Sequence, residues 1–328
     1  MKRVVLSVVF ASLLSAAAFA QSAAPEGSVP GGVRRPVRHP SIPPASLLMA
    51  YAPVAAPKIP GEEYGAVAGV ALNSKGHLYV FQRTQNALIE FDEKGAFVRN
   101  FGEGLATRAH NVRVDASDNI WLVDDYGHTV TKLNPEGKVL LTLGVKDRPG
   151  TWNEATGTRQ FNQPTDVAFA KNGDFYVSTA HGGPDPRIVR FDKTGKFLNT
   201  WSLAHEDGSR AVIHTVIVGP DGNVYAGDRE AMKIRVFTPA GVPLRDIAMK
   251  NLVCGLYVDS HGDLWMTAGH DGMIMHLDWS GHVLGWTGEI GNGANEYGEA
   301  HYLAITKDMK TIYVSDTNNN KLEKLVLP

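Results

Sequence analysis

The stretch GVALNSKGHLYVF at residues 69–81 is the first of six copies of one pattern. Each copy has an alternating apolar run, a polar turn, and a second apolar run that carries a Tyr or Trp near its start. Such alternation between turns rich in Gly, Asp and Asn is typical of short antiparallel strands. The other copies are NVRVDASDNIWLV (111–123), DVAFAKNGDFYVS (166–178), TVIVGPDGNVYAG (215–227), GLYVDSHGDLWMT (255–267) and YLAITKDMKTIYV (302–314).

Two more apolar runs complete the repeating unit, for example ALIEF at 87–91 and AFVRNF at 96–101 in the first copy. Four antiparallel strands that recur every 40 to 55 residues are typical of one blade of a β-propeller. The sequence therefore predicts an all-β, six-bladed propeller over residues 61–328. The sixth copy lacks a fourth run, and we expect the segment 46–55 to contribute the closing strand. From residue 64 onward the units resemble NHL-repeat propellers.

Composition limits the possible functions. The chain has 328 residues, of which 43% are hydrophobic, so it can bury a large core. Its 32 Lys and Arg against 34 Asp and Glu give a net charge of −2, which argues against nucleic-acid binding. Because Cys254 is the one cysteine, an internal disulfide and a cysteine-rich zinc module are both excluded.

The first 60 residues contain a targeting signal and a linker. Lys2 and Arg3 precede an apolar run at 4–18, and Ala-Phe-Ala at 18–20 precedes Gln21. This pattern predicts a signal peptide over 1–20, cleaved near Ala20/Gln21, because the run is shorter than the roughly 20 residues that span a bilayer. Residues 21–60 are rich in proline and predict an extended leader. We expect a periplasmic or secreted mature protein without a transmembrane segment.

Histidine recurs at one position of alternate units. The residue just before the first strand of each unit is, in order, Ala68, His110, Thr165, His214, Cys254 and His301. Alternate blades of a six-bladed ring lie about 120° apart, so the three imidazoles are expected to converge on the axis. A three-histidine set with an open position is how catalytic zinc is held, although neutral imidazole also suits copper, nickel and iron.

The position after the second strand adds charge. Arg83 and Arg229 occupy it in units one and four, and we expect both at the same mouth of the ring as the histidines. Two guanidinium groups there favour an anionic substrate. The alternative interpretation is that each arginine pairs with a neighbouring carboxylate. One residue further along, a general acid or base could be any of Tyr126, His181, Glu230 and His270.

Several motifs lie around these positions, namely His110-Asn111-Val112, Gln163-Pro164-Thr165-Asp166-Val167-Ala168, Arg187-Ile188-Val189, His214, Asp228-Arg229-Glu230 and His301. Together they resemble those of the peptidyl-α-hydroxyglycine α-amidating lyases, which are six-bladed propellers. By this resemblance His110, His214 and His301 bind zinc, and Arg83 and Arg229 act on the substrate.

The sequence departs from that family at three features. A Gly/Pro-rich insertion replaces the family's catalytic tyrosine, and His181 takes the nearest place in it, which makes His181 our candidate base. Tyr302 stands where the family has an aspartate that binds calcium, so only the backbone carbonyls of Val67 and Val112 are carried over as calcium ligands. The family's disulfides are absent.

Three functions follow from these patterns. The first is a zinc lyase that cleaves the carbon–nitrogen bond of a small anionic α-hydroxy-amide or a peptidyl-hydroxyglycine, releasing a primary amide and glyoxylate. The second is a non-catalytic NHL propeller that binds a partner. The third is a propeller hydrolase or lyase of the gluconolactonase or streptogramin-lyase kind, which the three axial histidines disfavour because those sites use acidic ligands or a His/Glu pair.

Overall fold

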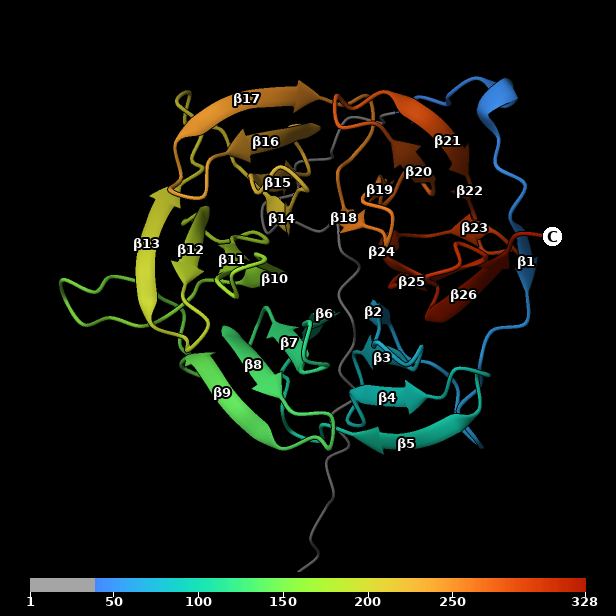
Figure 1. Cartoon of the computed structure of the whole chain (residues 1–328), viewed down its shortest axis with the longest axis horizontal. Coiled ribbons are helices and arrows are strands. Elements are labelled where there is room, and N and C mark those ends of the chain that lie inside the picture. The colour runs from blue at the N-terminus through green and yellow to red at the C-terminus, as the bar shows by residue number, and fades with distance from the viewer. Residues whose placement is uncertain (1–38) are drawn as a thin grey trace, which may run out of the picture. The chain divides into compact units, whose positions relative to one another are not determined.

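The computed structural model describes residues 39–328. They form six four-stranded antiparallel sheets that succeed one another around a ring, as the blades of a propeller (Figure 1). The predicted all-β, six-bladed architecture is therefore confirmed. The predicted signal peptide and its cleavage site lie outside the described residues. Within residues 39–328, no helix has the length and apolar character needed to cross a membrane.

Blades 1 to 3 each run from an innermost to an outermost strand in chain order. Blade 1 contains β2 (Val67–Leu72), β3 (Leu78–Gln82), β4 (Leu88–Phe91) and β5 (Phe97–Phe101). Blade 2 contains β6 (Ala109–Val114), β7 (Ile120–Asp124), β8 (Thr129–Leu133) and β9 (Val139–Gly144). Blade 3 contains β10 (Pro164–Phe169), β11 (Phe175–Thr179), β12 (Arg187–Phe191) and β13 (Phe197–Ser202).

Blades 4 and 5 repeat this order, and blade 6 uses both ends of the described chain. Blade 4 contains β14 (Ile213–Val218), β15 (Val224–Asp228), β16 (Lys233–Phe237) and β17 (Pro243–Ala248). Blade 5 contains β18 (Gly255–Val258), β19 (Leu264–Thr267), β20 (Ile274–Leu277) and β21 (Val283–Thr287). Blade 6 contains β24 (Ala300–Ile305), β25 (Thr311–Asp316), β26 (Lys321–Val326) and β1 (Ala52–Val54). Three short elements lie outside the blades, namely η1 (Ala45–Leu47), β22 (Glu289–Ile290) and β23 (Glu296–Tyr297).

The closing strand joins the two ends of the propeller. β1 pairs with β26 in antiparallel register, with Ala52 opposite Val326 and Val54 opposite Lys324. The segment just before β1 is tied to blade 5, because the indole nitrogen of Trp286 donates to the Pro44 carbonyl at 3.0 Å. These contacts fasten the start of the described chain to the last two blades and close the ring.

The recurring turn and the recurring aromatic residue explain each other. In blade 5, Asp259 Oδ1 accepts the backbone N–H groups of His261 and Asp263 at 2.8 and 3.0 Å. Its Oδ2 accepts the indole N–H of Trp265 at 2.8 Å. Gly262 in the same turn has a φ of 88°, a left-handed conformation that favours glycine. A local aspartate thus fixes the turn and also satisfies the buried indole of the next strand.

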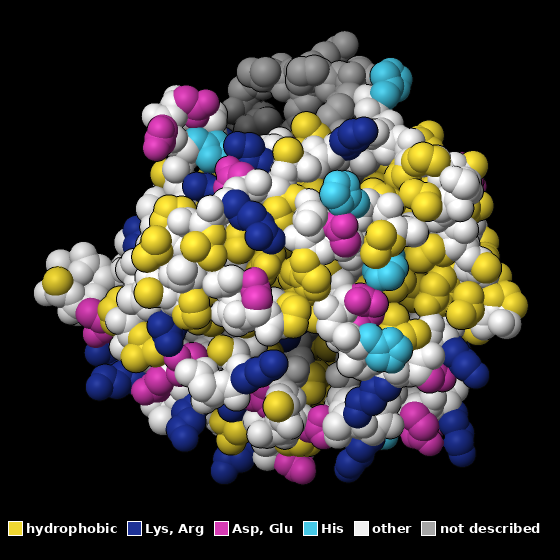
Figure 2. Space-filling model, turned by 45° about the horizontal axis from the view of Figure 1, so that its top comes forward, with side chains coloured by type: hydrophobic (Ala, Val, Ile, Leu, Met, Phe, Trp, Pro, Cys, Tyr) yellow, Lys and Arg dark blue, Asp and Glu magenta, His cyan; other side chains and the backbone are white. Residues whose placement is uncertain are grey.

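The apolar core lies between neighbouring blades. Each of six buried clusters combines side chains from adjacent sheets, as where Leu88 of blade 1 and Leu122 of blade 2 belong to one cluster. The innermost strands β2, β6, β10, β14, β18 and β24 contact one another around the axis, and many polar side chains on them are buried. On the side of the molecule that Figure 2 shows, Lys and Arg side chains are interspersed with Asp and Glu.

Candidate metal centre

The three histidines of the alternating pattern lie at β-bulges. The pairing between the first two strands of a blade shifts at Ala109/Asn111, at Ile213/Thr215 and at Ala300/Leu303. His110, His214 and His301 fall in these shifts. A bulged residue is released from the regular hydrogen-bond ladder and its side chain is re-aimed, so the bulge directs each imidazole out of its sheet.

The three imidazoles form a nearly equilateral triangle. The ring centroids of His110 and His214 are 4.8 Å apart, those of His110 and His301 are 5.0 Å apart, and those of His214 and His301 are 4.9 Å apart. All three side chains are fully buried. Residues separated by at least 87 positions in the chain therefore meet at one point, through the alternation of blades.

Each histidine of the triangle is oriented by the following blade. Its Nδ1 bonds to the backbone carbonyl of the residue at the equivalent position one blade further on, where the pattern has no histidine. Because a carbonyl only accepts, Nδ1 carries the hydrogen and Nε2 keeps its lone pair. The three bonds join His110 to Thr165 at 2.7 Å, His214 to Cys254 at 2.7 Å and His301 to Ala68 at 2.5 Å.

The electrostatic environment favours the neutral form of His110 and His214. Burial lowers the pKa of His110 well below its usual value, and the nearby His181 adds to this effect. Burial also lowers the pKa of His214, with a further contribution from Arg229. Nε2 of His110 is buried and makes no hydrogen bond within the described part of the chain. A neutral imidazole whose buried lone pair is unsatisfied is the form that binds a transition metal, so the site fits such an ion.

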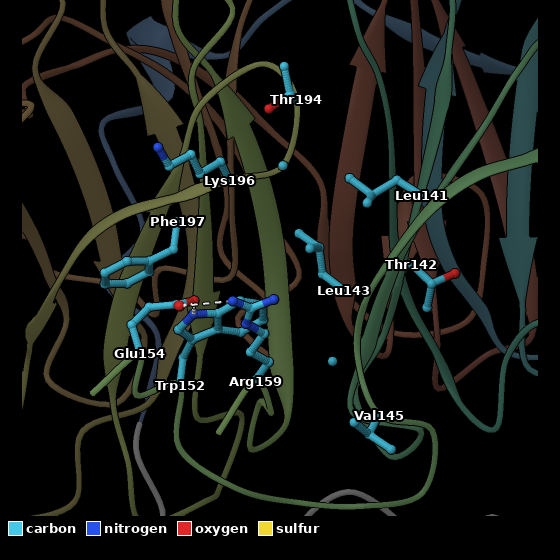
Figure 3. Close-up of a pocket in the computed structure, with 12 residues that line it drawn as sticks. Leu141, Thr142, Leu143, Val145, Trp152, Glu154, Arg159, Thr194, Lys196 and Phe197 are labelled. Carbon is cyan, nitrogen blue, oxygen red and sulfur yellow. Dashed lines mark hydrogen bonds and ion pairs between the residues drawn. The ribbon is translucent and has the colours of Figure 1, made fainter. Parts of the chain in front are cut away.

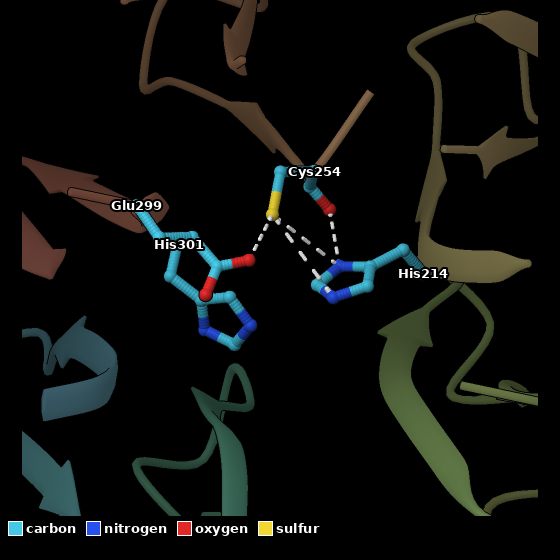
Figure 4. A group of neighbouring side chains, drawn as sticks. All are labelled: His214, Cys254, Glu299 and His301. Atoms are coloured by element: carbon cyan, nitrogen blue, oxygen red, sulfur yellow. Dashed lines mark hydrogen bonds between the residues drawn. The ribbon is translucent and has the colours of Figure 1, made fainter. Parts of the chain in front are cut away.

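Two overlapping groups of potential ligands meet here. One consists of His110, His181 and His214, and the other of His214, Cys254, Glu299 and His301; within each group the ligand atoms lie within 4.8 Å of one another. Figure 4 shows Cys254 between the carboxylate of Glu299 and the ring of His214, at 3.9 Å from Glu299 Oε1 and 4.0 Å from His214 Nε2. His214 belongs to both groups and is the centre of the cluster.

A buried aspartate organises the first group. Arg108 donates from Nε to Asp125 Oδ1 at 2.9 Å and from its terminal nitrogen to Oδ2. His181 Nδ1 lies 3.2 Å from the same Oδ2. Burial alone would raise the pKa of Asp125, but the hydrogen bonds and charge of Arg108 outweigh burial and lower it. Asp125 is therefore a carboxylate that joins a guanidinium to the imidazole of His181.

A buried glutamate organises the second group. Glu299 is fully buried, and its Oε1 lies 3.5 Å from Arg229 Nη1 and 3.5 Å from His270 Nε2. Thr317 Oγ1 donates to the other carboxylate oxygen. Arg229 Nε is also 3.3 Å from Glu230. The charge of Arg229 is thus shared between two carboxylates beside the histidine triangle.

Comparison with known proteins points to one enzyme family. No protein-family model matches the chain. A probable peptidyl-α-hydroxyglycine α-amidating lyase of Caenorhabditis elegans is 25% identical over 306 residues, which cover 82% of this chain and 84% of that protein. This chain is similar to the α-amidating lyases. The resemblance drawn from its motifs is confirmed.

Further relatives agree, and they also differ in length. The α-amidating lyase 1 of Drosophila melanogaster is 24% identical over 80% of this chain, and the mouse peptidyl-glycine α-amidating monooxygenase is 26% identical over 80%. The matches span 57% of the fly protein and 30% of the mouse protein. A solved streptogramin B lyase, 14% identical, covers 85% of this chain with a TM-score of 0.61, which shows a shared fold.

The two arginines that the resemblance to the amidating lyases assigns to substrate lie beside the triangle. Arg83 is half-buried, and its Nε donates to the carbonyl of Ala109 at 3.1 Å, next to His110. Arg229 is buried and pairs with Glu230 and Glu299. Pairing with carboxylates, the alternative raised from sequence, therefore applies to Arg229.

Arg108, Asp125 and Glu299 were absent from the sequence-based site. Arg108 and Glu299 each stand two positions before a histidine of the triangle. Side chains two residues apart on a strand lie on the same face, and extending β6 and β24 back by one residue would reach Arg108 and Glu299, so this spacing is a signal that could have identified them. The signal is weak, because a bulge follows each of them and its geometry cannot be read from one sequence.

The calcium ion implied by the resemblance does not fit. Val67 and Val112, whose carbonyls were the predicted ligands, are buried in β2 and β6. Tyr302 donates its hydroxyl to the carbonyl of His214 at 2.6 Å. The guanidinium of Arg113 lies 5.5 Å from the Tyr302 ring and pairs with Asp166. Calcium prefers six to eight oxygen ligands that include carboxylates. At this position the structure has the phenol of Tyr302 and the positively charged guanidinium of Arg113, which already pairs with the Asp166 carboxylate.

A separate cleft lies at the rim of the propeller. It has a volume of about 610 Å³ and runs between β9 and β13, where Trp152 donates to Glu154 at 3.1 Å and Arg159 pairs with the same carboxylate (Figure 3). None of its lining residues belongs to the metal cluster. The cleft therefore has no part in the candidate chemistry.

Proposed function

We propose that the protein is a zinc-dependent lyase that cleaves the carbon–nitrogen bond of an α-hydroxyglycine amide to a primary amide and glyoxylate. The observation that carries this proposal is the buried histidine triangle with all three Nδ1 atoms bonded to carbonyls. Similarity to amidating lyases over 80–82% of the chain supports the same reaction class. The substrate would be a small peptide-like molecule with a carboxylate.

His110, His214 and His301 would hold the zinc ion through Nε2. Their bonds to the neighbouring carbonyls fix the tautomer and the orientation of each ring before any metal arrives. A zinc ion held by these residues would supply Lewis acidity, which would lower the pKa of a hydroxyl group. The surrounding burial favours the neutral form of His110 and His214.

Arg83 would bind the substrate carboxylate. Its guanidinium is held beside His110 by the bond to Ala109, and a guanidinium presents paired donors that match a carboxylate. Arg229 would contribute positive charge at the opposite side of the triangle, although Glu299 and Glu230 offset part of that charge. Arg83 is therefore the main anchor and Arg229 the secondary one.

His181 would act as the base. It takes the proton of the substrate hydroxyl at Nε2, and Asp125 stabilises the positive charge that forms on the ring. The oxygen then forms the aldehyde double bond of glyoxylate while the bond between carbon and the amide nitrogen breaks. The electron pair of that bond stays on nitrogen, which takes the proton back from the imidazolium of His181 and becomes the primary amide. All atoms are accounted for without an oxidant or an added water.

The test is release of glyoxylate from a synthetic α-hydroxyglycine amide. Zinc-loaded protein is incubated with N-benzoyl-α-hydroxyglycine, and separately with ureidoglycolate, with His214→Ala as the matched inactive control. We expect glyoxylate and benzamide in equal amounts from the wild type and only the background rate from the variant. No glyoxylate from either compound at full zinc occupancy would refute the lyase.

A binding scaffold is the second candidate. The mouse NHL repeat-containing protein 3 is 29% identical over 53% of this chain, and its name carries no enzymatic activity. A scaffold with a structural metal predicts that His214→Ala lowers the melting temperature and that no substrate is turned over. In either case we propose a periplasmic or secreted location, which an N-terminus at Gln21 in the mature protein would support.

A further inference from the structure

A fourth histidine lies against the metal triangle. The ring centroid of His181 is 4.6 Å from that of His110 and 5.0 Å from that of His214. A ring nitrogen of His181 lies within 4.8 Å of ligand nitrogens of both. Two nitrogen ligands of a tetrahedral zinc ion are about 3.3 Å apart, as follows from Zn–N bonds of roughly 2 Å. Small side-chain movements would therefore bring His181 into the coordination sphere.

The hydrogen bonding of His181 leaves one nitrogen for a metal. Nδ1 is 3.2 Å from Asp125 Oδ2 and 3.0 Å from the terminal nitrogen of Arg108, while Nε2 is buried without a hydrogen-bond partner among residues 39–328. If Nδ1 donates to Asp125, Nε2 has an unused lone pair; if Nδ1 accepts from Arg108, Nε2 has an unused hydrogen. A metal ion satisfies the first arrangement, and nothing described nearby satisfies the second.

The backbone that carries His181 is held in an unusual conformation. Ala180 has a φ of 83°, which is rare for a residue with a side chain. The backbone N–H groups of Ala180 and His181 both point to the carbonyl of Gln163, at 2.9 and 3.3 Å. Backbone held in such sparsely populated regions is common at functional sites. The strained turn places the imidazole over the triangle and keeps it there.

We propose that His181 is a fourth protein ligand of the metal ion in the substrate-free protein, with Asp125 as the residue that positions it. The carboxylate–imidazole–metal arrangement is a recurring device that fixes the tautomer of a ligand and raises its basicity. With His301, which shares the second group of potential ligands with His214, four histidines would then surround the ion. This proposal rests on the proposed function, since it assumes that the triangle binds a metal.

Metal binding by His181 would determine when its Nε2 can act as the base. An imidazole nitrogen that is bound to a metal cannot accept a proton at the same time. Entry of the substrate must therefore release His181 Nε2, and that release makes the base available only when a substrate is present. Asp125 and Arg108 keep the released ring within reach, because they hold its Nδ1 side.

The experiment counts ligands and does not require turnover. Wild type, His181→Ala and Asp125→Asn are loaded with Co²⁺, and visible absorption reports the coordination, while zinc affinity is measured by competition with a chromophoric chelator. His282→Ala is the matched control, because that histidine is exposed and pairs with Asp278. X-ray absorption of the zinc-loaded wild type counts imidazoles without any variant.

The expected results separate the two proposals. We expect four imidazoles in the wild type, an altered cobalt spectrum and at least about tenfold weaker zinc binding in His181→Ala, and about tenfold weaker binding in Asp125→Asn. Three imidazoles, or a wild-type spectrum and affinity in His181→Ala, would overturn the fourth ligand and leave the proposed function standing. Absence of metal binding in the wild type would overturn both.

Discussion

Replacement of Arg113 by methionine tests how the buried polar residues around the axis of the propeller are stabilised. Asp166 is fully buried and accepts two bonds from the Arg113 guanidinium, at 2.9 Å from Nε and 2.7 Å from Nη2. It also accepts neutral donors from Asn111 at 2.7 Å and Thr215 at 2.8 Å. Burial would lower the pKa of Arg113, but Asp166 outweighs it and raises that pKa, so the guanidinium stays charged.

The size of the effect follows from this geometry. Breaking a buried ion pair by removing one partner costs about 3–5 kcal/mol. The neutral donors that remain on Asp166 place the expected loss near the lower end, at about 3 kcal/mol. For about 290 folded residues the unfolding entropy is roughly 0.6 kcal/mol per degree. Arg113→Met is therefore expected to lower the melting temperature by about 5 °C.

The assay is calorimetry of the zinc-loaded protein with a matched variant. Arg159→Met removes a pair with Glu154 whose side chains are 66% and 32% exposed, so it should cost at most about 1 kcal/mol. Adding Asp166→Asn to Arg113→Met should recover part of the loss, because the buried charge is then gone. A shift in Arg113→Met no larger than that in Arg159→Met would refute this reasoning.

Three further predictions concern metal, pH and substrate. Calcium with or without EGTA should leave the melting temperature of the zinc-loaded protein unchanged, whereas a rise of several degrees with calcium would contradict the misfit described above. In the metal-free protein, the lowered pKa values of His110 and His214 mean that the native state binds fewer protons than the unfolded state below about pH 6.5. The free energy of unfolding should therefore be highest above pH 6.5 and fall by about 1 kcal/mol per histidine between pH 6.5 and pH 5.5. Urea midpoints that do not change over this range would count against neutral rings. Arg83→Ala should raise KM for the hydroxyglycine amide about tenfold or more with a smaller change in kcat, while Arg245→Ala should not, and equal KM values would exclude Arg83 as the carboxylate anchor.

The blades could be predicted because their signals are local. The turn at Asp259 and Gly262 and the indole of Trp265 are all within a few residues of one another, so the pattern that folds them is visible in the chain. The alternation of His110, His214 and His301 was also visible, because it follows from counting aligned units. The approximate six-fold symmetry of the ring then predicted that histidines on alternate blades converge on the axis, although the sequence gives no distances.

The surroundings of the triangle could not be predicted in the same way. Glu299 meets Arg229 across 70 residues of sequence, and Arg108 meets His181 across 73. These contacts depend on the tilt of each sheet relative to the propeller axis and on the direction in which each bulge points its side chain. Sequence indicated that Tyr302 removes a carboxylate, but its bond to the His214 carbonyl arises only from packing around the axis.

The most direct test of the account is the amount of zinc bound by the purified protein, measured for the wild type, His214→Ala and His282→Ala. His214 belongs to both groups of potential ligands, whereas His282 is exposed, pairs with Asp278 and belongs to neither group. The account predicts one zinc per chain in the wild type and in His282→Ala, and a clear loss in His214→Ala. No tightly bound metal in the wild type, or equal zinc in all three proteins, would contradict the axial metal centre.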